Sequence, residues 1–223
     1  MRSKPVLALL GVCLLGVLVL VVIGATSERR EAFTLGVVPS VAVVPLDSGE
    51  YVCQAPIQMP DDAAFDRIAF VLGTDGRPGP AIDVIVQPFR AQGELGRGRL
   101  AADYTGRAVR HVVDVGHVDT DRPFQVCLSN DGPRKVSVYG NADVSARASS
   151  ASMGPVPTNA DIALVFERAE SRSTLSLLGT MLDRAALWRA SWVGGWFMIL
   201  LAALVVLAVP ALLVRALRDA TDS

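Results

Sequence analysis

The stretch FQVCLSNDGPRKVSVYG, residues 124–140, decides the fold of the middle of this chain. It contains two short runs in which apolar and polar residues alternate, a pattern typical of half-buried β-strands. Asn130, Asp131 and Gly132 separate the runs, and an Asp-Gly step supplies the left-handed backbone positions that a tight turn needs. We therefore expect a β-hairpin here, with Cys127 near the end of its first strand.

Cys127 has one candidate partner outside the apolar segments, which is Cys53 in EYVCQAP, residues 50–56. An even pair of cysteines in an exported domain is typical of a structural disulfide. The alternative is a metal or redox pair, but the two cysteines lack CxxC spacing and neither has a histidine close by in sequence. We predict a Cys53–Cys127 disulfide that makes neighbours of distant parts of the sequence.

Nine apolar or alternating runs between residues 40 and 168 repeat one theme, in which each run is followed by Gly, Pro, Asn or Asp. They are rich in Val, Ile, Phe and Tyr, which favour strands. Their regular spacing predicts a mainly β fold, an antiparallel β-sandwich or jelly roll. Residues 146–161, rich in small residues and proline, are predicted to form a loop. The nine runs are residues 41–46, 51–55, 67–73, 81–89, 98–104, 110–118, 124–130, 135–141 and 162–168.

The two ends of the chain carry apolar segments of membrane-spanning length, residues 6–25 and 193–214. A helix of about 20 apolar residues crosses the hydrocarbon core of a bilayer. Neither segment contains an ionisable residue, which is typical of anchors and argues against a transporter or proton relay. A cleaved signal peptide ending at Ala25 is the alternative interpretation of the first segment. Cys13 lies inside this segment, and we expect it to face lipid or a helix.

The residues that flank the second segment predict how it meets the membrane. Trp188, Trp192 and Trp196 are typical of an aromatic belt at the bilayer interface. Leucines at helical spacing in residues 171–192 predict an amphipathic juxtamembrane helix, with Ser173 as its N-cap. Its apolar stripe could lie on the outer membrane surface or pack against the β domain.

Basic residues next to both apolar segments favour cytoplasmic termini and place the middle of the chain outside the cytoplasm. The expected localisation is therefore the plasma membrane, or inner membrane, as a two-pass protein. The expected order is a cytoplasmic N-terminus (1–5), a transmembrane helix (6–25), the extracytoplasmic β-sandwich (26–170), the juxtamembrane helix (171–192), a transmembrane helix (193–214) and a cytoplasmic tail (215–223).

Candidate chemical groups are sparse in the predicted β domain. His111 and His117 lie six residues apart, on the same face of a continuous strand, and are weak candidates for a metal site, with solvated histidines as the simpler interpretation. Tyr51, Tyr104 and Tyr139 are speculative platforms for sugar rings, although each also fits an ordinary half-buried strand position. We predict no catalytic residue and no cofactor. The net charge of −1 also argues against a nucleic-acid partner.

Four segments carry a resemblance to a known group of proteins: YVCQAP (51–56), LGTDGRPGPAIDV (72–84), VCLSNDGPRKVSVYGN (126–141) and DIALVF (161–166). With the Trp-rich flank and the final apolar segment, they resemble a family of two-pass envelope proteins of G+C-rich bacteria, over most of the chain. The resemblance implies an envelope setting and a glycan-assembly membrane protein as a partner, and it brings no assigned activity. In outline, the predicted sandwich is similar to carbohydrate-binding modules.

The function we expect from the sequence is non-catalytic, that of an accessory or binding protein of the bacterial cell envelope. Its partners would be the lipid bilayer and either an envelope glycan or a partner membrane protein. Two alternatives stay open at this point. One is a metal-dependent envelope hydrolase that uses the two histidines, and the other is a sensor subunit that acts through a partner.

Overall fold

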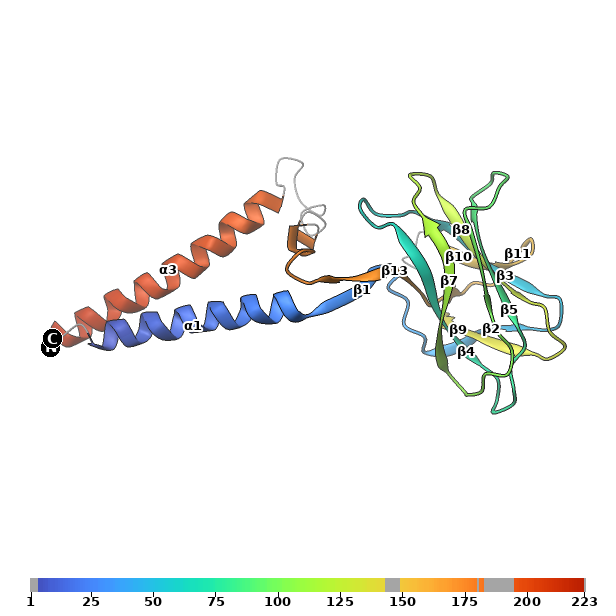
Figure 1. Ribbon diagram of the computed structural model, residues 1–223, viewed down its shortest axis with the longest axis horizontal. Coiled ribbons are helices and arrows are strands. Elements are labelled where there is room, and N and C mark those ends of the chain that lie inside the picture. Colours follow the sequence, from blue (N-terminus) through green and yellow to red (C-terminus); the bar gives the residue numbers. More distant parts are fainter. Residues whose placement is uncertain (1–3, 143–148, 180, 183–194, 223) are drawn as a thin grey trace. The chain divides into compact units, whose positions relative to one another are not determined.

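The computed structural model describes residues 4–142, 149–179, 181–182 and 195–222 (Figure 1). The chain divides into two compact units, of which one comprises Arg30–Glu170 and the other comprises the two ends of the chain. The first unit is built from strands and the second contains the two long helices. The protein is thus mainly β with a few helices, as the sequence predicts.

The described strands form two antiparallel sheets. The first has the order β1-β13-β4-β9-β12, with β2 paired to β9 and β7 paired to β4, and the second has the order β11-β10-β3-β8-β5-β6 (Figure 1). The strands are β1 (Glu28–Thr34), β2 (Val41–Leu46), β3 (Tyr51–Ile57), β4 (Phe65–Gly73), β5 (Ile82–Pro88), β6 (Gly96–Leu100), β7 (Val109–Val118), β8 (Phe124–Asn130), β9 (Val136–Asn141), β10 (Ser150–Met153), β11 (Val156–Pro157), β12 (Asp161–Ile162) and β13 (Leu164–Ser173).

One hydrophobic cluster draws residues from both sheets. Phe65 of β4 and Phe166 of β13 come from the first sheet, and their rings each lie 5.8 Å from the ring of Phe124 in β8 of the second. All three side chains are fully buried. Burying one such side chain stabilises a fold by about 1.5–3 kcal/mol, so this aromatic cluster is a main source of the contact between the sheets.

The predicted hairpin at residues 124–140 is wrong, because β8 and β9 belong to different sheets. Their connection crosses from one sheet to the other, and neither Asp131 nor Gly132 has a positive φ. The fully buried Asn130 holds the crossover instead. Its amide donates to the carbonyls of Leu46 and Arg134, at 3.0 and 2.7 Å, and its oxygen accepts from the Gly132 N–H at 3.0 Å.

The Cys53–Cys127 disulfide is confirmed. Cys53 in β3 lies directly opposite Cys127 in β8, with a Cα–Cα distance of 4.0 Å. Side chains alternate between the two faces of a strand. Val52 and Leu128, the next opposed pair, belong to the shared hydrophobic cluster, so the disulfide lies on the other face of its sheet.

Glycines let β6 lie very close to β7, at the edges of the two sheets. A Cβ on Gly96 would lie 2.6 Å from the carbonyl oxygen of Val115, and one on Gly98 would collide with the carbonyl of Asp114. The alternate placement of Gly96 and Gly98 therefore serves close packing between strands of different sheets.

The predicted loop at residues 146–161 is wrong in part, because some of its residues form strands. β10 extends the second sheet by pairing with β3, from Ser150 opposite Ala55 to Met153 opposite Val52, and β11 pairs with β10. The small and polar residues of β10 show little alternation of apolar and polar positions. Local sequence pattern alone therefore could not identify β10 as a strand near the edge of the second sheet. β1 was not predicted either, because ERREAFT has only two buried positions, Ala32 and Phe33.

The predicted juxtamembrane helix begins later than expected, because β13 continues to Ser173. The Ser173 hydroxyl accepts from the Ser176 N–H at 3.2 Å, which is the geometry of the predicted cap. The Met181 N–H donates to the Leu177 carbonyl at 2.9 Å in the short helical stretch that follows. Half of the predicted helix, residue 180 and residues 183–192, lies outside the described residues.

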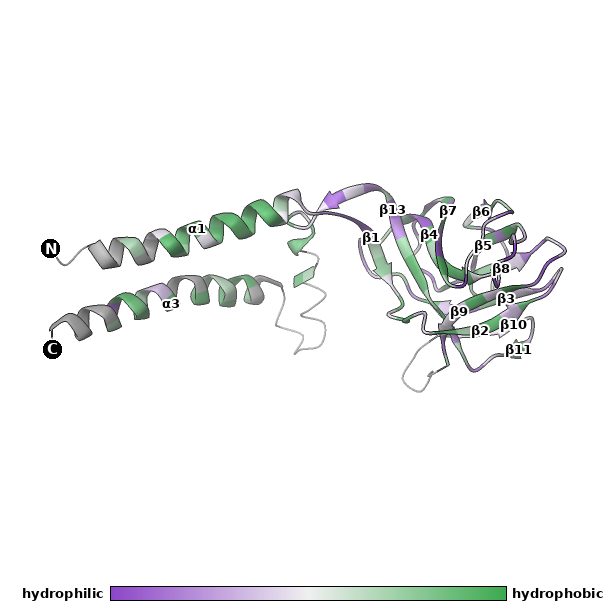
Figure 2. Cartoon of the chain, turned by 90° about the horizontal axis from the view of Figure 1, so that it is seen from below, coloured by the Kyte–Doolittle hydropathy of each residue, from purple (hydrophilic) through white to green (hydrophobic). Residues whose placement is uncertain are grey.

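The two long helices are α1 (Lys4–Thr26) and α3 (Gly195–Asp222). Figure 2 shows hydrophobic residues along much of α1 and in the described part of α3. Among the described residues, Ile199–Ala216 is the one stretch of helix long and apolar enough to cross a membrane, and Gly11–Thr26 is a shorter apolar stretch. α3 contains Pro210 and continues through the predicted tail at 215–222 as helix.

Candidate functional site

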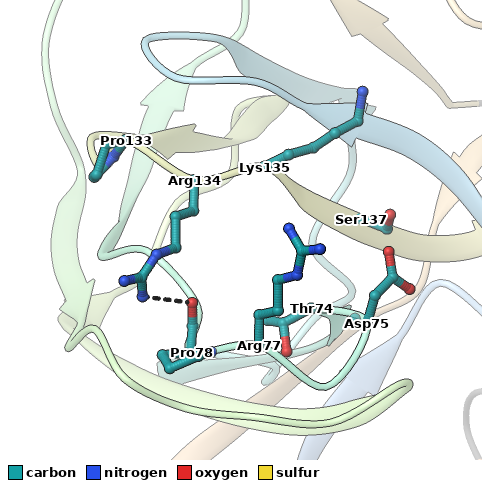
Figure 3. Close-up of a pocket in the computed structure, with 9 residues that line it drawn as sticks. Thr74, Asp75, Arg77, Pro78, Pro133, Arg134, Lys135 and Ser137 are labelled. Atoms are coloured by element: carbon teal, nitrogen blue, oxygen red, sulfur yellow. Dashed lines mark hydrogen bonds between the residues drawn. The ribbon is translucent and has the colours of Figure 1, made fainter.

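A pocket of about 550 Å³ opens between two loops of the β unit (Figure 3). One loop joins β4 to β5 and the other is the crossover from β8 to β9. These loops are far apart in sequence, and the pairing of Gly73 with Ser137 on adjacent strands brings them together. The lining residues are Gly73, Thr74, Asp75, Arg77, Pro78, Pro133, Arg134, Lys135 and Ser137.

Backbone geometry holds the β4–β5 loop in one conformation. Thr74 is buried and donates its N–H to the Gly106 carbonyl at 2.8 Å, while its hydroxyl accepts from the Gly106 N–H at 3.2 Å. The Arg77 N–H then closes a turn onto the Thr74 carbonyl at 3.0 Å. Asp75 and Gly76 have positive φ values of 52° and 79°, a conformation that Asp and Gly adopt more readily than most residues.

The second wall of the pocket follows from the crossover. Because the Asn130 amide binds the Arg134 carbonyl, residues 131–134 form a compact loop. The Arg134 guanidinium then donates from Nη1 to the Pro78 carbonyl at 3.1 Å, so it links this loop to the β4–β5 loop (Figure 3).

The lining carries three cationic side chains, Arg77, Arg134 and Lys135, and one acidic side chain, Asp75. Lys135 forms an ion pair with Asp47 at 3.3 Å, and its ammonium points away from the two guanidinium groups (Figure 3). Arg77 makes no side-chain hydrogen bond or ion pair with any residue that the structure describes. Its guanidinium rises into the space between the two loops, with Arg134 on one side and Asp75 and Ser137 on the other (Figure 3).

A smaller hollow of about 320 Å³ adjoins this pocket and shares Pro133 and Arg134 with it. Its other arginine, Arg99, is already paired, with Asp83 at 3.1 Å and Asp131 at 3.4 Å. Carboxylates therefore neutralise the cation in the second hollow, whereas the Arg77 charge in the first has no such partner among the described residues.

The structure does not bring the three tyrosines together in one cleft. Tyr51 is 47% exposed on β3 of the second sheet, and Tyr139 lies half-buried on β9 of the first. Tyr139 is next to the pocket, because a Cβ on Gly73 would lie 2.7 Å from its ring. Tyr104 lies in the β6–β7 connection, where its ring covers Gly79.

Tyr104 and His111 form a half-buried aromatic pair, with ring centroids 4.6 Å apart. The Tyr104 hydroxyl and the His111 Nε2 are buried and have no hydrogen-bond partner within the described part of the chain. Burial raises the pKa of Tyr104 and lowers the pKa of His111. Both groups are therefore neutral near pH 7, and His111 carries no charge that a ligand could use.

His117 lies in a different setting from His111, although both are on β7. A register shift interrupts the regular β4–β7 pairing near Gly116, whose φ is +79°, so the two histidines are separated by an irregular part of the strand. The His117 Nδ1 lies 2.9 Å from Asp66 Oδ1. Burial alone would raise the pKa of Asp66, but hydrogen bonds from the Ala169 N–H and from His117 outweigh it and lower that pKa.

The described residues contain no group of three His, Cys, Asp or Glu side chains that could hold a metal ion. The pocket lining contains neither histidine nor cysteine. What the lining does offer is a pair of guanidinium groups beside the Ser137 hydroxyl. Guanidinium groups bind carboxylate and phosphate through parallel hydrogen bonds. The lining therefore contains the groups that bind an oxyanion.

Of the three tryptophans of the predicted interface belt, Trp196 is described. It is 58% exposed near the start of α3, where its ring meets that of Phe197 at 5.8 Å. Trp188 and Trp192 lie outside the described residues.

Sequence reasoning did not identify Arg77, Arg134 and Lys135 as site residues. The segments that carry them, GTDGRPGP (73–80) and NDGPRK (130–135), entered it as turn signals and as part of the family resemblance. The available signal was a cation at the end of each turn, which becomes a site once the topology places the two turns side by side.

No protein-family model matches this chain, and no curated protein matches it.

Proposed function

We propose that this chain is a membrane-anchored, non-catalytic binding protein of the bacterial cell envelope. Its β unit is a sandwich displayed outside the cytoplasm, and the helices α1 and α3 cross the plasma membrane and leave both termini inside. The observation that carries the proposal is the Cys53–Cys127 disulfide, in a unit that lies between two apolar helices in sequence. Disulfides of this kind are typical of exported domains and rare in the cytoplasm.

The sandwich arrangement is supported by the hydrophobic cluster that the two sheets share. In a β-sandwich, each sheet buries one face against the other, and the side chains of the two inner faces form one shared core. The anchor role is supported by the apolar stretch Ile199–Ala216 and by the shorter stretch Gly11–Thr26, which contain no acidic residue. An exposed apolar helix is stable in lipid, where its backbone groups are satisfied internally.

A binding role is favoured over catalysis by the composition of the pocket. Its side chains are cations, one carboxylate, prolines and hydroxyls, held on two rigid loops. Such a surface suits the binding of an anionic group through charge-assisted hydrogen bonds. The ligand would be an envelope glycan, or the exported face of a partner membrane protein that assembles one.

The proposal is tested by cross-linking cells that contain tagged full-length protein and identifying what is recovered with it by mass spectrometry. The matched control keeps both helices and replaces residues 30–170 with an unrelated exported β domain. We expect an envelope glycan or a glycan-assembly membrane protein to be enriched about tenfold with the native chain over the control. Recovery of the native chain alone, or of the same partner with both chains, would contradict a binding role for the β unit.

A further inference from the structure

We infer that the pocket between the β4–β5 loop and the β8–β9 crossover binds the acid group of an envelope saccharide, a sugar chain that carries carboxylate or phosphate. The inference rests on the proposed function and names its ligand class. It follows from the charges, the size and the rigidity of the pocket, which are taken in turn.

The charges select an anion. Asp75 is the one acidic side chain in the lining, against Arg77, Arg134 and Lys135. Asp47 neutralises Lys135 from outside the lining, which leaves the two guanidinium groups. The Arg134 guanidinium donates from one nitrogen to the Pro78 carbonyl. The Arg77 guanidinium makes no hydrogen bond to any described residue. Two guanidinium groups facing one space repel each other, and an oxyanion between them removes that repulsion.

The size of the pocket indicates a ligand larger than a single oxyanion. Its volume of about 550 Å³ lies within the usual range for small-molecule sites, which is about 300–1,000 Å³. The side opposite Arg134 carries Asp75 and Ser137, which accept and donate hydrogen bonds (Figure 3). These groups suit sugar hydroxyls.

The walls are held before any ligand arrives. Thr74 ties one loop to Gly106, Asn130 ties the other loop to Leu46, and Arg134 joins the two. A site that is already ordered loses little conformational entropy on binding. Outside this pocket, Arg97 and Arg99 are paired with the carboxylate of Asp83. Within the lining, Arg77 is the cation whose guanidinium has no partner among the described residues, so it is the group most open to an anionic ligand.

The test uses full-length protein in a polyoxyethylene detergent, which offers neither sugar nor anion. The probes are tetragalacturonate and glucose 6-phosphate as acidic sugars, maltotetraose as the neutral sugar, and inorganic phosphate. Binding is measured by calorimetry for the native chain, for Arg77→Ala, and for Arg122→Ala as the matched control. Arg122 is also exposed, and it precedes β8, at the opposite end of that strand from the crossover.

We expect at least one acidic sugar to bind about tenfold more tightly than maltotetraose. Arg77→Ala should weaken that binding about tenfold and Arg122→Ala should leave it unchanged, since a charge-assisted hydrogen bond contributes on the order of this factor. Which acidic sugar responds tells carboxylate from phosphate. Raising the salt concentration should weaken the same binding, because the pocket is open to solvent.

Three results would overturn the inference: equal binding of the neutral sugar, equal loss in both variants, or inorganic phosphate bound as tightly as the acidic sugars. The proposed function fails separately. If no acidic sugar binds but the cross-linked partner is retained, the pocket inference falls and the binding role stands. If acidic sugars bind through Arg77 but the β unit faces the cytoplasm, the pocket stands and the envelope role falls.

Discussion

At the scale of single residues, Asn130 has the largest effect on topology. Its buried amide satisfies two carbonyls and one N–H of the backbone around it, and these bonds let the chain leave one sheet and enter the other. Leaving such groups unpaired costs about 1–3 kcal/mol each, so this position tolerates few substitutions. Gln54 has a similar role near β12, where its amide binds Asp161 at 2.7 Å and accepts from the Ile162 N–H at 3.0 Å.

His111 gives a prediction about pH at the same scale. Its folded-state pKa lies below the usual 6.5, because burial disfavours the charged ring. The unfolded state therefore binds more protons between the folded pKa and 6.5. The stability that depends on neutral His111 is present above 6.5 and is lost as the pH falls through the lowered pKa.

We expect the urea midpoint of the β unit, followed by pulse proteolysis, to be lower near pH 5.5 than near pH 7.5. His111→Phe keeps an aromatic ring beside Tyr104 and removes the buried Nε2, so it should flatten this dependence. His117→Gln, at an exposed position of the same strand, is the control and should retain it. A slope that His111→Phe leaves intact would show that another group titrates in this range.

At the scale of elements, neighbouring strands are held by different means. The β5–β6 hairpin carries the ion pairs of Arg97 and Arg99 with Asp83, which are partly exposed and contribute little to stability. β6 reaches β7 through glycines, where steric fit alone decides the approach. The β3–β8 pair adds a covalent bond between residues 74 positions apart in sequence.

The disulfide gives a prediction at this scale. Replacing both Cys53 and Cys127 with alanine should lower the free energy of unfolding of the β unit by about 2–5 kcal/mol, because the open chain has more conformational freedom when unfolded. A reducing agent should destabilise the native chain by a similar amount and leave the double variant unchanged. Cys13→Ser is the control and should behave as the native chain does. A native chain whose midpoint does not respond to reduction would mean that the bond is not formed in the purified protein.

At the scale of the whole molecule, the β unit is enclosed in sequence between the two apolar helices. The proposed topology predicts which surface positions a membrane-impermeant maleimide reaches in intact cells. In a Cys13→Ser background, Ser48→Cys lies on the exposed β2–β3 turn and should be labelled without permeabilisation. Ser3→Cys and Thr221→Cys, near the two ends of the chain, should be labelled only after the membrane is opened.

Protection of Ser48→Cys in intact cells would place the β unit in the cytoplasm and contradict the proposed topology. Labelling of both Ser3→Cys and Ser48→Cys without permeabilisation would instead mean that α1 does not cross the membrane. The two results are distinguishable because each residue lies on a different side of an apolar helix in sequence.

Local pattern in the sequence determined the composition of most strands, because alternation of apolar residues and turn residues acts within a few positions. It also indicated the disulfide, since two cysteines in a β-rich segment between apolar ends leave one pairing. It did not reveal β1, β10 or the extension of β13, whose residues gain strand structure by pairing at a sheet edge and carry little apolar signal of their own.

Only the tertiary structure shows that β8 and β9 belong to different sheets. One of the Asn130 hydrogen bonds that direct the crossover reaches the Leu46 carbonyl, which is remote in sequence. The same crossover places Arg134 beside Pro78 and leaves Arg77 facing it. A pocket of this kind belongs to no single segment. Local residue patterns therefore determined which segments form most of the strands, whereas long-range pairing and packing decided which loops meet, because those interactions set the distances between segments far apart in the chain.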